Sequence, residues 1–452
     1  MKAYPEYVYT PLPWLLKIPA HWNFIRSKHI FQEAKELVGE NASSYVLLSL
    51  TTKGIIRRDV LSGKGKFPKD FDTYKIVAKG DMAFCLFDID ETPRTVGLSN
   101  FDGMLTGAYT IFHVNNINPR YAYYYYLSLD DVKAMRPLYS GLRKTINVGT
   151  FLSTKMPVPP RSEQDQIVRF LDWKVSEINK LISIKKDQIV LLQEQQAVQI
   201  SNIVTYGLFS DVPTKETSID WIGRIPEHWE TLRCKYLFTE RDERSQEGKE
   251  QHLSMSQKHG LIPDSQLDER RMLSESYIGG KLCHKDDLVL NRLKAHLGVF
   301  AIAPQDGVIS PDYTVLIPNI DRIIPAYAEM LLKSLRCRRE LRIRVRGIIE
   351  GFWRLYTDDF YTIVLPVPPL EEQSKIMNHI KQLRETNDKY IDILTQEICN
   401  LQEFRQRLIS DVVTGKMDVR DINIPEYEFV EENVSDNMEN EENDTSLMIG
   451  EM

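Results

Sequence analysis

The segment Met156-Pro157-Val158-Pro159-Pro160, with Glu163-Gln164 close behind it, decides the fold because the chain contains this pattern twice. It recurs 209 residues later as Leu365-Pro366-Val367-Pro368-Pro369, and the pair Glu372-Gln373 again follows. A helix that follows two consecutive prolines cannot extend back through them toward the N-terminus. Each copy therefore predicts a hinge at which a new element begins. The period also excludes a solenoid, whose units span roughly 20–45 residues.

A second box repeats in the same order. Ile18-Pro19-Ala20-His21-Trp22 recurs 207 residues later as Ile225-Pro226-Glu227-His228-Trp229. The chain therefore consists of two halves of about 205 residues, each with a globular segment, a proline-rich hinge and a long polar segment. The tryptophan in each box could bind a ligand, but a buried ring that anchors a loop after the proline turn is the favoured interpretation.

Each polar segment predicts a long helix. Apolar residues recur at steps of three and four, which average 3.5 residues and are typical of a coiled-coil seam. The positions expected to pair are Val175, Ile178, Ile182, Ile189 and Leu192 in the first half and Ile391, Leu394, Ile398, Leu401 and Leu408 in the second. One such stripe usually packs on its own domain, but two matched stripes favour two helices that pair antiparallel.

The ends of these helices also have sequence signals. Ser162 and Asp165 form a capping-box pattern at the first start, while Glu371 and Glu372 suit the second. Gly207 and Gly415 stand where the helices should stop. About forty helical residues at a rise of 1.5 Å would make a rod of roughly 60 Å.

The globular segments predict an α+β fold of short strands. Short apolar runs bounded by Gly, Pro, Asn or Asp predict strands in 44–50, 82–87, 108–114, 287–290, 299–303 and 313–317, and residues 121–129 and 326–333 suit helices.

Motifs for catalysis are missing from the sequence. No phosphate-cradling Gly-rich loop, zinc-binding His-Glu-x-x-His or nucleophile elbow occurs, so no catalytic residue is predicted. The five cysteines have no short pair spacing, which argues against a disulfide framework or a metal site and fits a reducing cytoplasm. No apolar run is long enough to span a membrane.

Charge is distributed unevenly along the chain. Between Asp421 and Met452 lie eleven Asp and Glu residues and no Lys or Arg, so this tail is expected to be disordered. A solubilising extension is favoured over a strand that mimics nucleic acid. Without these eleven negative charges, the net charge of −7 becomes about +4 for the rest of the chain. The charge of this part is therefore compatible with a nucleic-acid partner.

Basic residues cluster in both globular segments, in predicted loops that suit phosphate contacts and base readout. Each one alone is more simply a solvated surface charge, and the argument rests on the clusters. The candidate DNA-binding residues are Lys53, Arg57, Arg58, Lys64, Lys66, Arg143 and Lys144 in the first half and Lys258, Arg292, Lys294, Arg344, Arg346 and Arg354 in the second.

Taken together, the two pairs of boxes resemble the specificity subunits of type I restriction–modification enzymes, and the resemblance covers nearly the whole chain. The ending Thr414-Gly415-Lys416-Met417-Asp418-Val419-Arg420 also resembles an element of that family. The resemblance implies target-recognition domains at 1–155 and 207–364 and conserved spacer helices at 156–206 and 365–421. The acidic tail, 422–452, departs from what the family needs, and we assign it no role.

The same resemblance implies partners. The two domains would read an asymmetric, bipartite target in double-stranded DNA, and the helices would set the gap between its two parts. The helices would also dock two modification (methyltransferase) subunits. Restriction (translocase/endonuclease) subunits would join this complex. S-adenosylmethionine, ATP and Mg would belong to those partners, with no cofactor in this chain. The alternative is a coiled-coil interaction scaffold without DNA specificity.

Overall fold

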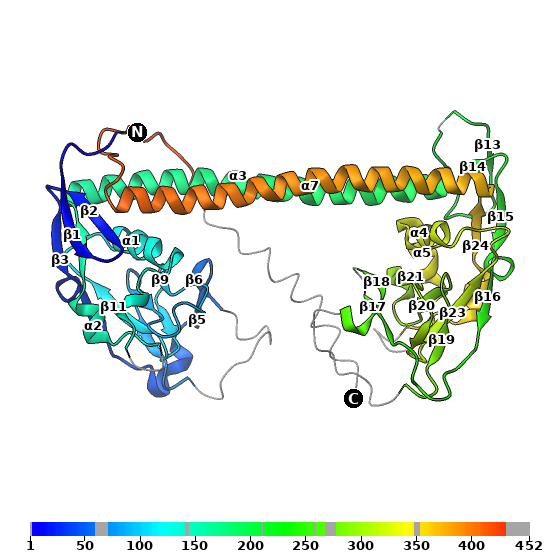
Figure 1. The fold of residues 1–452 in the computed structure, drawn as a ribbon, viewed down its shortest axis with the longest axis horizontal. Helices are drawn as coiled ribbons and strands as arrows, with labels where there is room; N and C mark the ends of the chain where they lie inside the picture. The colour runs from blue at the N-terminus through cyan, green and yellow to red at the C-terminus, as the bar shows by residue number, and fades with distance from the viewer. Residues whose placement is uncertain are drawn as a thin grey trace. The chain divides into compact units, whose positions relative to one another are not determined.

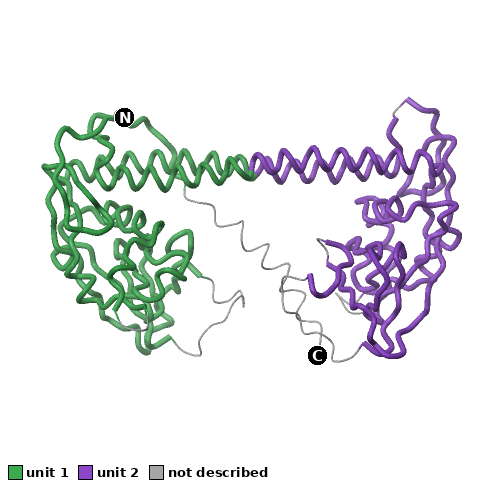
Figure 2. The backbone as a smooth tube through the Cα atoms, in the orientation of Figure 1, with its two compact units in different colours: residues 1–186, 395–452 green, residues 187–394 purple. Residues whose placement is uncertain are grey.

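A computed structural model describes residues 2–58, 71–140, 144–209, 211–256, 259–266, 277–347 and 353–430. The chain forms two compact units, and each combines one globular segment with parts of both long helices (Figure 2). Unit 1 comprises residues 1–186 and 395–452, and unit 2 comprises residues 187–394. Four candidate DNA-binding residues, Lys64, Lys66, Arg143 and Lys258, lie outside the described residues.

Unit 1 is built on a four-stranded antiparallel sheet in the order β4-β11-β8-β9; two of its strands, β9 and β11, are labelled in Figure 1. Its strands are β4 (Phe31–Ala34), β11 (Thr110–Val114), β8 (Met82–Phe84) and β9 (Val96–Leu98). Side chains alternate between its faces, and Phe84 and Phe112 pack with Phe31 and Phe151 in one aromatic cluster. Helix α1 (Pro119–Asp131) packs on β9.

Smaller elements surround this sheet. The two-stranded pairs are β1 (Tyr7–Leu12) with β2 (Leu15–Pro19), β3 (Asn23–Arg26) with β12 (Lys155–Val158), β5 (Leu48–Thr51) with β6 (Gly54–Arg57), and β7 (Lys75–Val77) with β10 (Gly103–Leu105). Unit 1 also contains the short helix α2 (Val148–Ser153) and the 3-10 turns η1 (Ser27–His29), η2 (Gly39–Ser44) and η3 (Arg136–Leu138).

Unit 2 repeats the sheet order of unit 1, as the duplicated boxes predict. Its sheet runs β16-β23-β20-β21, formed by β16 (Phe238–Arg241), β23 (Tyr313–Pro318), β20 (Leu288–Asn291) and β21 (Phe300–Ile302). The pairs are β13 (Thr214–Glu216) with β14 (Arg224–Pro226), β15 (Glu230–Arg233) with β24 (Val364–Val367), β17 (Leu253–Ser256) with β18 (Gly260–Pro263), and β19 (Lys281–Cys283) with β22 (Gly307–Ile309). Its helices are α4 (Pro325–Lys333), α5 (Leu335–Arg344) and α6 (Thr357–Thr362), with 3-10 turns η4 (Cys234–Tyr236), η5 (Asp264–Gln266) and η6 (Ala295–Leu297).

Two long helices run antiparallel, as predicted: α3 (Arg161–Tyr206) and α7 (Leu370–Val413). In unit 1, Asn179 contacts Arg405, and Lys185, further along α3, pairs with Glu397, earlier on α7. In unit 2, Ile200 and Val204 share a hydrophobic cluster with residues 376 and 380. The ten positions named for the seam are all buried or half-buried.

The first helix starts differently from the prediction. Helix α3 begins at Arg161, so Ser162 lies inside its first turn, exposed, and the predicted Ser162–Asp165 capping box is wrong. The amides of Glu163 and Gln164 donate instead to the Pro160 carbonyl. The carboxylate of Asp165 accepts a hydrogen bond of 2.8 Å from Asn118, at the start of α1.

Residues 156–158 and 365–367, placed in the spacer segments from the sequence, form strands β12 and β24. They pair antiparallel with β3 and β15, so the proline-rich hinge belongs to a globe before the helix starts. Helix α7 does carry Glu371 and Glu372 in its first turn.

In each unit, the Ile-Pro-x-His-Trp box contacts the Glu-Gln pair at the start of a long helix. Trp22 and Trp229 are buried, as predicted. In unit 1, Glu163 accepts hydrogen bonds from the Tyr4 hydroxyl (2.6 Å) and the Trp22 indole (3.0 Å). His21 lies 2.8 Å from the same carboxylate, and the equivalent pair His228–Glu372 in unit 2 is separated by 2.7 Å. Glu of the Glu-Gln pair therefore holds the His of the Ile-Pro-x-His-Trp box.

A glycine ends each helix against the tryptophan of the other repeat. Gly207, after α3, has a φ of +88° and faces Trp229; Gly415, after α7, has a φ of +73° and faces Trp22. Both take the left-handed conformation that glycine adopts without strain. A methyl group at Gly415 would overlap Pro19 and lie 3.2 Å from the Trp22 ring.

The start of the acidic tail differs from the disorder predicted for residues 422–452. The Val430 amide donates to the Ser176 hydroxyl (3.0 Å), and the Asn179 amide donates to the Val430 carbonyl (3.1 Å). The Phe429 ring lies against Arg120. Residues 422–430 thus pack on α3 and α1 because an aromatic ring and satisfied backbone groups compensate for the ordering of the chain; residues 431–452 lie outside the described part.

Replacing Gly415 with Ala should destabilise unit 1 by about 3 kcal/mol. The left-handed backbone contributes about 1 kcal/mol, and overlap with Pro19 adds about 1–3 kcal/mol. Gly39→Ala is the matched control, because Gly39 also has a positive φ (+56°) but has no atom near its missing Cβ. It should cost about 1 kcal/mol in denaturant unfolding. Equal losses in the two variants would show that the junction is not closely packed.

Candidate nucleic-acid interface

In unit 1 the described basic candidates gather on the β5–β6 hairpin. Lys53 lies in the turn, whose Thr51 hydroxyl donates to the Gly54 carbonyl (3.0 Å) and accepts from the Lys53 amide (3.2 Å). Arg57, at the other end of β6, is exposed and its guanidinium lies 4.5 Å from the centre of the Phe101 ring. Arg58 follows and is half-buried. The hairpin thus presents basic groups at both its ends.

Lys144 lies in a different environment. Its ammonium is 2.8 Å from Glu91 and 3.4 Å from Asp90. A hydrogen bond from the Tyr139 hydroxyl, and then the nearby Lys144, lower the pKa of Asp90 below its usual value. These carboxylates offset the charge of Lys144, so a phosphate there would have to displace them.

The structure brings three basic segments of unit 2 together. Arg346 and Arg354 pair through their backbones in both directions, at 2.9 and 2.8 Å. The amide of Leu355 donates to the carbonyl of Arg292 (3.0 Å). Lys294 caps η6 and is half-buried. Residues 292–294, 346 and 354 therefore form one local surface, which sequence separation alone does not indicate.

Arg344, one of the candidates predicted in loops, instead ends the arginine-rich helix α5 (Leu335–Arg344). Ser334 caps this helix through a hydrogen bond to the Cys337 amide, and Cys337 and Leu341 are buried, so an apolar face holds the helix despite its charge. Arg344 pairs with Glu340 on the same helix (2.7 Å). Arg346 pairs with Asp359.

A buried network positions Arg292. Its guanidinium donates to the Thr314 hydroxyl (2.8 Å) and lies 3.6 Å from Glu240, which also binds the buried Lys281 at 3.0 Å. Burial alone would raise the pKa of Glu240, but hydrogen bonds from Thr357 and Lys281 lower it. Glu240 therefore stays ionised and fixes the direction of Arg292.

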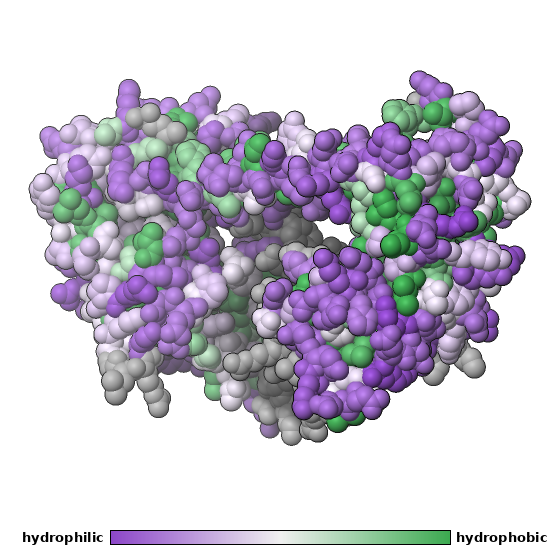
Figure 3. Space-filling view, turned by 45° about the vertical axis from the view of Figure 1, so that its right-hand side comes forward, coloured by the Kyte–Doolittle hydropathy of each residue, from purple (hydrophilic) through white to green (hydrophobic). Residues whose placement is uncertain are grey.

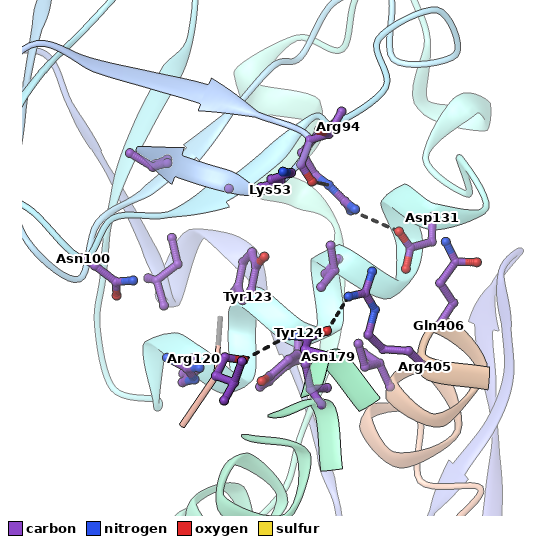
Figure 4. Close-up of a pocket in the computed structure, with 18 of the residues that line it drawn as sticks. Lys53, Arg94, Asn100, Arg120, Tyr123, Tyr124, Asp131, Asn179, Arg405 and Gln406 are labelled. Atoms are coloured by element: carbon purple, nitrogen blue, oxygen red, sulfur yellow. Dashed lines mark hydrogen bonds and ion pairs between the residues drawn. The ribbon is translucent and has the colours of Figure 1, made fainter. Parts of the chain in front are cut away.

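Some basic residues near the hairpin could not be identified from the sequence. Arg94, Arg120 and Arg405 come from separate segments and line one pocket of unit 1 with Lys53 (Figure 4). These residues lie far apart in the sequence, and only the fold brings them together.

Hydrophilic side chains cover most of the visible surface of both units (Figure 3). In the described part of the chain, no group of three His, Cys, Asp or Glu could hold a metal ion. No described helix is long and apolar enough to cross a membrane.

Comparison with known proteins agrees with the resemblance. A family model of the type I restriction modification DNA specificity domain matches residues 64–190. Two proteins of Methanocaldococcus jannaschii are similar in sequence to this chain. The putative type I restriction enzyme MjaX specificity subunit is 24% identical over 289 residues, covering 62% of this chain and 63% of that protein. The type I restriction enzyme MjaVIII specificity subunit is 25% identical over 292 residues, covering 60% and 64%.

The chain thus matches less than two thirds of the length of either relative. A solved structure concerned with complex assembly and conformational transition of the type I R-M system has the same fold. It shares 14% identity with a TM-score of 0.52 and covers 88% of this chain and 99% of its own. A crystal structure of the HsdS subunit from Thermoanaerobacter tengcongensis is 14% identical, with a TM-score of 0.47 over 88% of this chain and 98% of its own.

In its duplicated boxes and over residues 64–190, the chain is thus similar to type I restriction–modification specificity subunits.

Proposed function

We propose that the chain is the non-catalytic DNA-recognition subunit of a type I restriction–modification complex. Its target would be an asymmetric, bipartite sequence in double-stranded DNA. The globular segments within 1–155 and 207–364 would each read one part, and the spacer segments 156–206 and 365–421 would set the gap. The observation that carries the proposal is that one sheet order occurs in both units, while the basic candidates that the structure describes lie mainly on different elements.

This difference supports two unlike half-sites. In unit 1 the described cations lie mainly on the β5–β6 hairpin, and in unit 2 they lie beside η6 and at positions 346 and 354. Globular segments with the same sheet order would dock in similar ways on the duplex, while their different side chains would contact different base edges. Identical surfaces would instead favour a palindromic target.

A salt titration of DNA binding tests the proposal against the scaffold alternative. The whole chain is mixed with random-sequence duplex, and the dissociation constant is measured from about 50 to 200 mM salt. A DNA-recognition subunit should lose affinity steeply, with a log–log slope of about −0.9 for each phosphate neutralised. A scaffold without DNA specificity should show no binding over this range.

Arg354→Ala should weaken DNA binding and reduce the magnitude of the salt slope by about 1, because it removes one phosphate-contacting charge. Arg354 is exposed beside Arg292, so the fold should tolerate the change. Lys381→Ala is the matched control, since this side chain is 75% exposed on α7 and is not one of the DNA-binding candidates. An unchanged slope in Arg354→Ala would remove this residue from the interface.

The long helices carry apolar residues that the seam does not use. Leu181 and Ile184 on α3 are 47% and 45% exposed, and Tyr390 and Ile393 on α7 are 57% and 56% exposed. Each α7 position follows its α3 counterpart by 209 residues, the period of the hinge. Matched exposed apolar positions support two equivalent docking sites. We infer that two modification subunits dock there, one on each unit, and that restriction subunits join the resulting complex.

Leu181→Glu/Ile184→Glu should remove one docking site, because two buried carboxylates without partners oppose association. Native mass spectrometry with the modification subunit should then give one bound copy instead of two. Tyr390→Glu/Ile393→Glu should give the same result, and the quadruple variant should bind none. Lys180→Glu, on a neighbouring exposed position, should still bind two copies. Two copies on the quadruple variant would contradict the assignment of these sites.

A further inference from the structure

Helix α5 of unit 2 is strongly cationic. Its residues, Leu335–Arg344, include five arginines and a single acidic residue, Glu340. Glu340 pairs with one of the five, Arg344, at 2.7 Å, so four arginines remain. Among the described residues no carboxylate pairs with any of these four, which are Arg336, Arg338, Arg339 and Arg342. The helix therefore keeps positive charge that its surroundings within the described chain do not neutralise.

Three of these arginines lie on the solvent side of α5. Arg336, Arg339 and Arg342 are exposed and follow one another at steps of three, which places neighbouring side chains about 5–6 Å apart on the helix surface. The Arg336 guanidinium lies 4.9 Å from the centre of the Tyr206 ring. The side chains of Arg339 and Arg342 form no ion pair with the described residues, so their guanidinium donors are available to an external anion.

Arg338, the fourth arginine, points inward and also lacks a counter-ion. It lies so close to the backbone of Gly298 that a Cβ there would be 2.5 Å from its Nε. This Nε is buried and has no hydrogen-bond partner among the described residues. Burial lowers the pKa of the Arg338 guanidinium. A partly buried cation without a counter-ion is costly, and an anion bound on α5 would offset part of that cost.

Helix α5 adjoins the basic surface of unit 2 that includes Lys294 and Arg354. It lies beside α4 and packs on η6, which Lys294 caps (Figure 1). Burial of the ring, and then the charge of Arg342, lower the pKa of His296 in η6. The His296 ring meets the Trp353 ring edge-on, with 5.5 Å between their centres, and Trp353 directly precedes Arg354. Arg342 therefore extends the surface to which we assign DNA contacts.

The corresponding segment of unit 1 has its charges offset. It follows α1, as α5 follows α4, and its cations at residues 132–138 are Lys133 and Arg136. Lys133 binds Asp130 at 2.8 Å, and Arg136 lies 3.4 Å from Asp90. Both described cations of this segment thus have a carboxylate partner, whereas four arginines of α5 have none.

We propose that α5 binds the phosphate backbone of duplex DNA through Arg339 and Arg342 and so gives unit 2 a sequence-independent anchor. The inference rests on the proposed function. Guanidinium groups match the geometry of phosphate oxygens, and contacts to phosphates position a protein on the duplex without reading its sequence. Unit 2 therefore holds DNA of any sequence through α5, while contacts to base edges select the target.

Arg339→Gln/Arg342→Gln tests the anchor, because glutamine keeps a high helix propensity while it removes both charges. At about 100 mM salt the whole chain should bind random duplex roughly fifty-fold more weakly, and its salt slope should fall in magnitude by about 2, since two phosphate contacts are lost. Arg339→Gln alone should lower the slope by about 1. Arg339→Lys/Arg342→Lys retains both charges and should keep the slope. An unchanged slope in the double glutamine variant would overturn the inference.

A control in unit 1 tests whether the anchor belongs to unit 2. Arg136→Gln removes one exposed arginine from the corresponding segment, and it should leave the salt slope unchanged because Asp90 already offsets this charge. A fall of about 1 in its slope would contradict the assignment to unit 2. The double glutamine variant should also lose affinity for the selected target and for random duplex by the same factor. Loss of affinity for the target alone would show that α5 reads bases.

Two further outcomes separate this inference from the proposed function. If the unsubstituted chain binds duplex and the double glutamine variant keeps its slope but loses a modification subunit in native mass spectrometry, α5 docks protein and the inference alone fails. If the unsubstituted chain binds no duplex from about 50 to 200 mM salt, the proposed function fails and the inference fails with it.

Discussion

The contact between a buried tryptophan and the glycine that ends a helix of the other repeat is the constraint on which both units depend. Trp22 packs on Gly415, and Trp229 packs on Gly207. Each globe therefore completes its base with a helix end that the opposite half of the sequence supplies. Tyrosines reinforce this closure, since Tyr121 donates to the carbonyl of Val413 (3.4 Å) and Tyr327 to that of Val204 (2.8 Å). The globular segment of each repeat consequently depends on the helix end of the other repeat.

Much of this organisation was predictable because the decisive signals are repeated or periodic. The duplicated boxes predict two like globes, and the 3.5-residue spacing predicts the antiparallel helices. The helix start at Arg161 was not predictable, because capping depends on which backbone groups remain free once β12 has formed. Helix α5 was missed because its charge hid an apolar face of only two buried residues, Cys337 and Leu341.

The candidate interface was predictable in composition but not in geometry. The sequence shows where cations are frequent, but ion pairs such as Lys144 with Glu91 and Arg346 with Asp359 appear only in the fold. Long-range contacts decide which charges remain directed outward. Glu240 illustrates this, since a carboxylate distant in sequence orients Arg292 while compensating the buried Lys281. Residues 422–430, which pack on α3 and α1, and the pocket of unit 1 likewise join segments that no local pattern connects.

The central claim is that two globular segments with the same sheet order carry different DNA-reading surfaces. The most direct test is to select bound duplexes from a random library with the whole chain and its modification subunits. The account predicts enrichment of two different half-sites separated by a fixed number of unspecified base pairs. Enrichment of a palindrome, of a single continuous site, or of no sequence at all would contradict it.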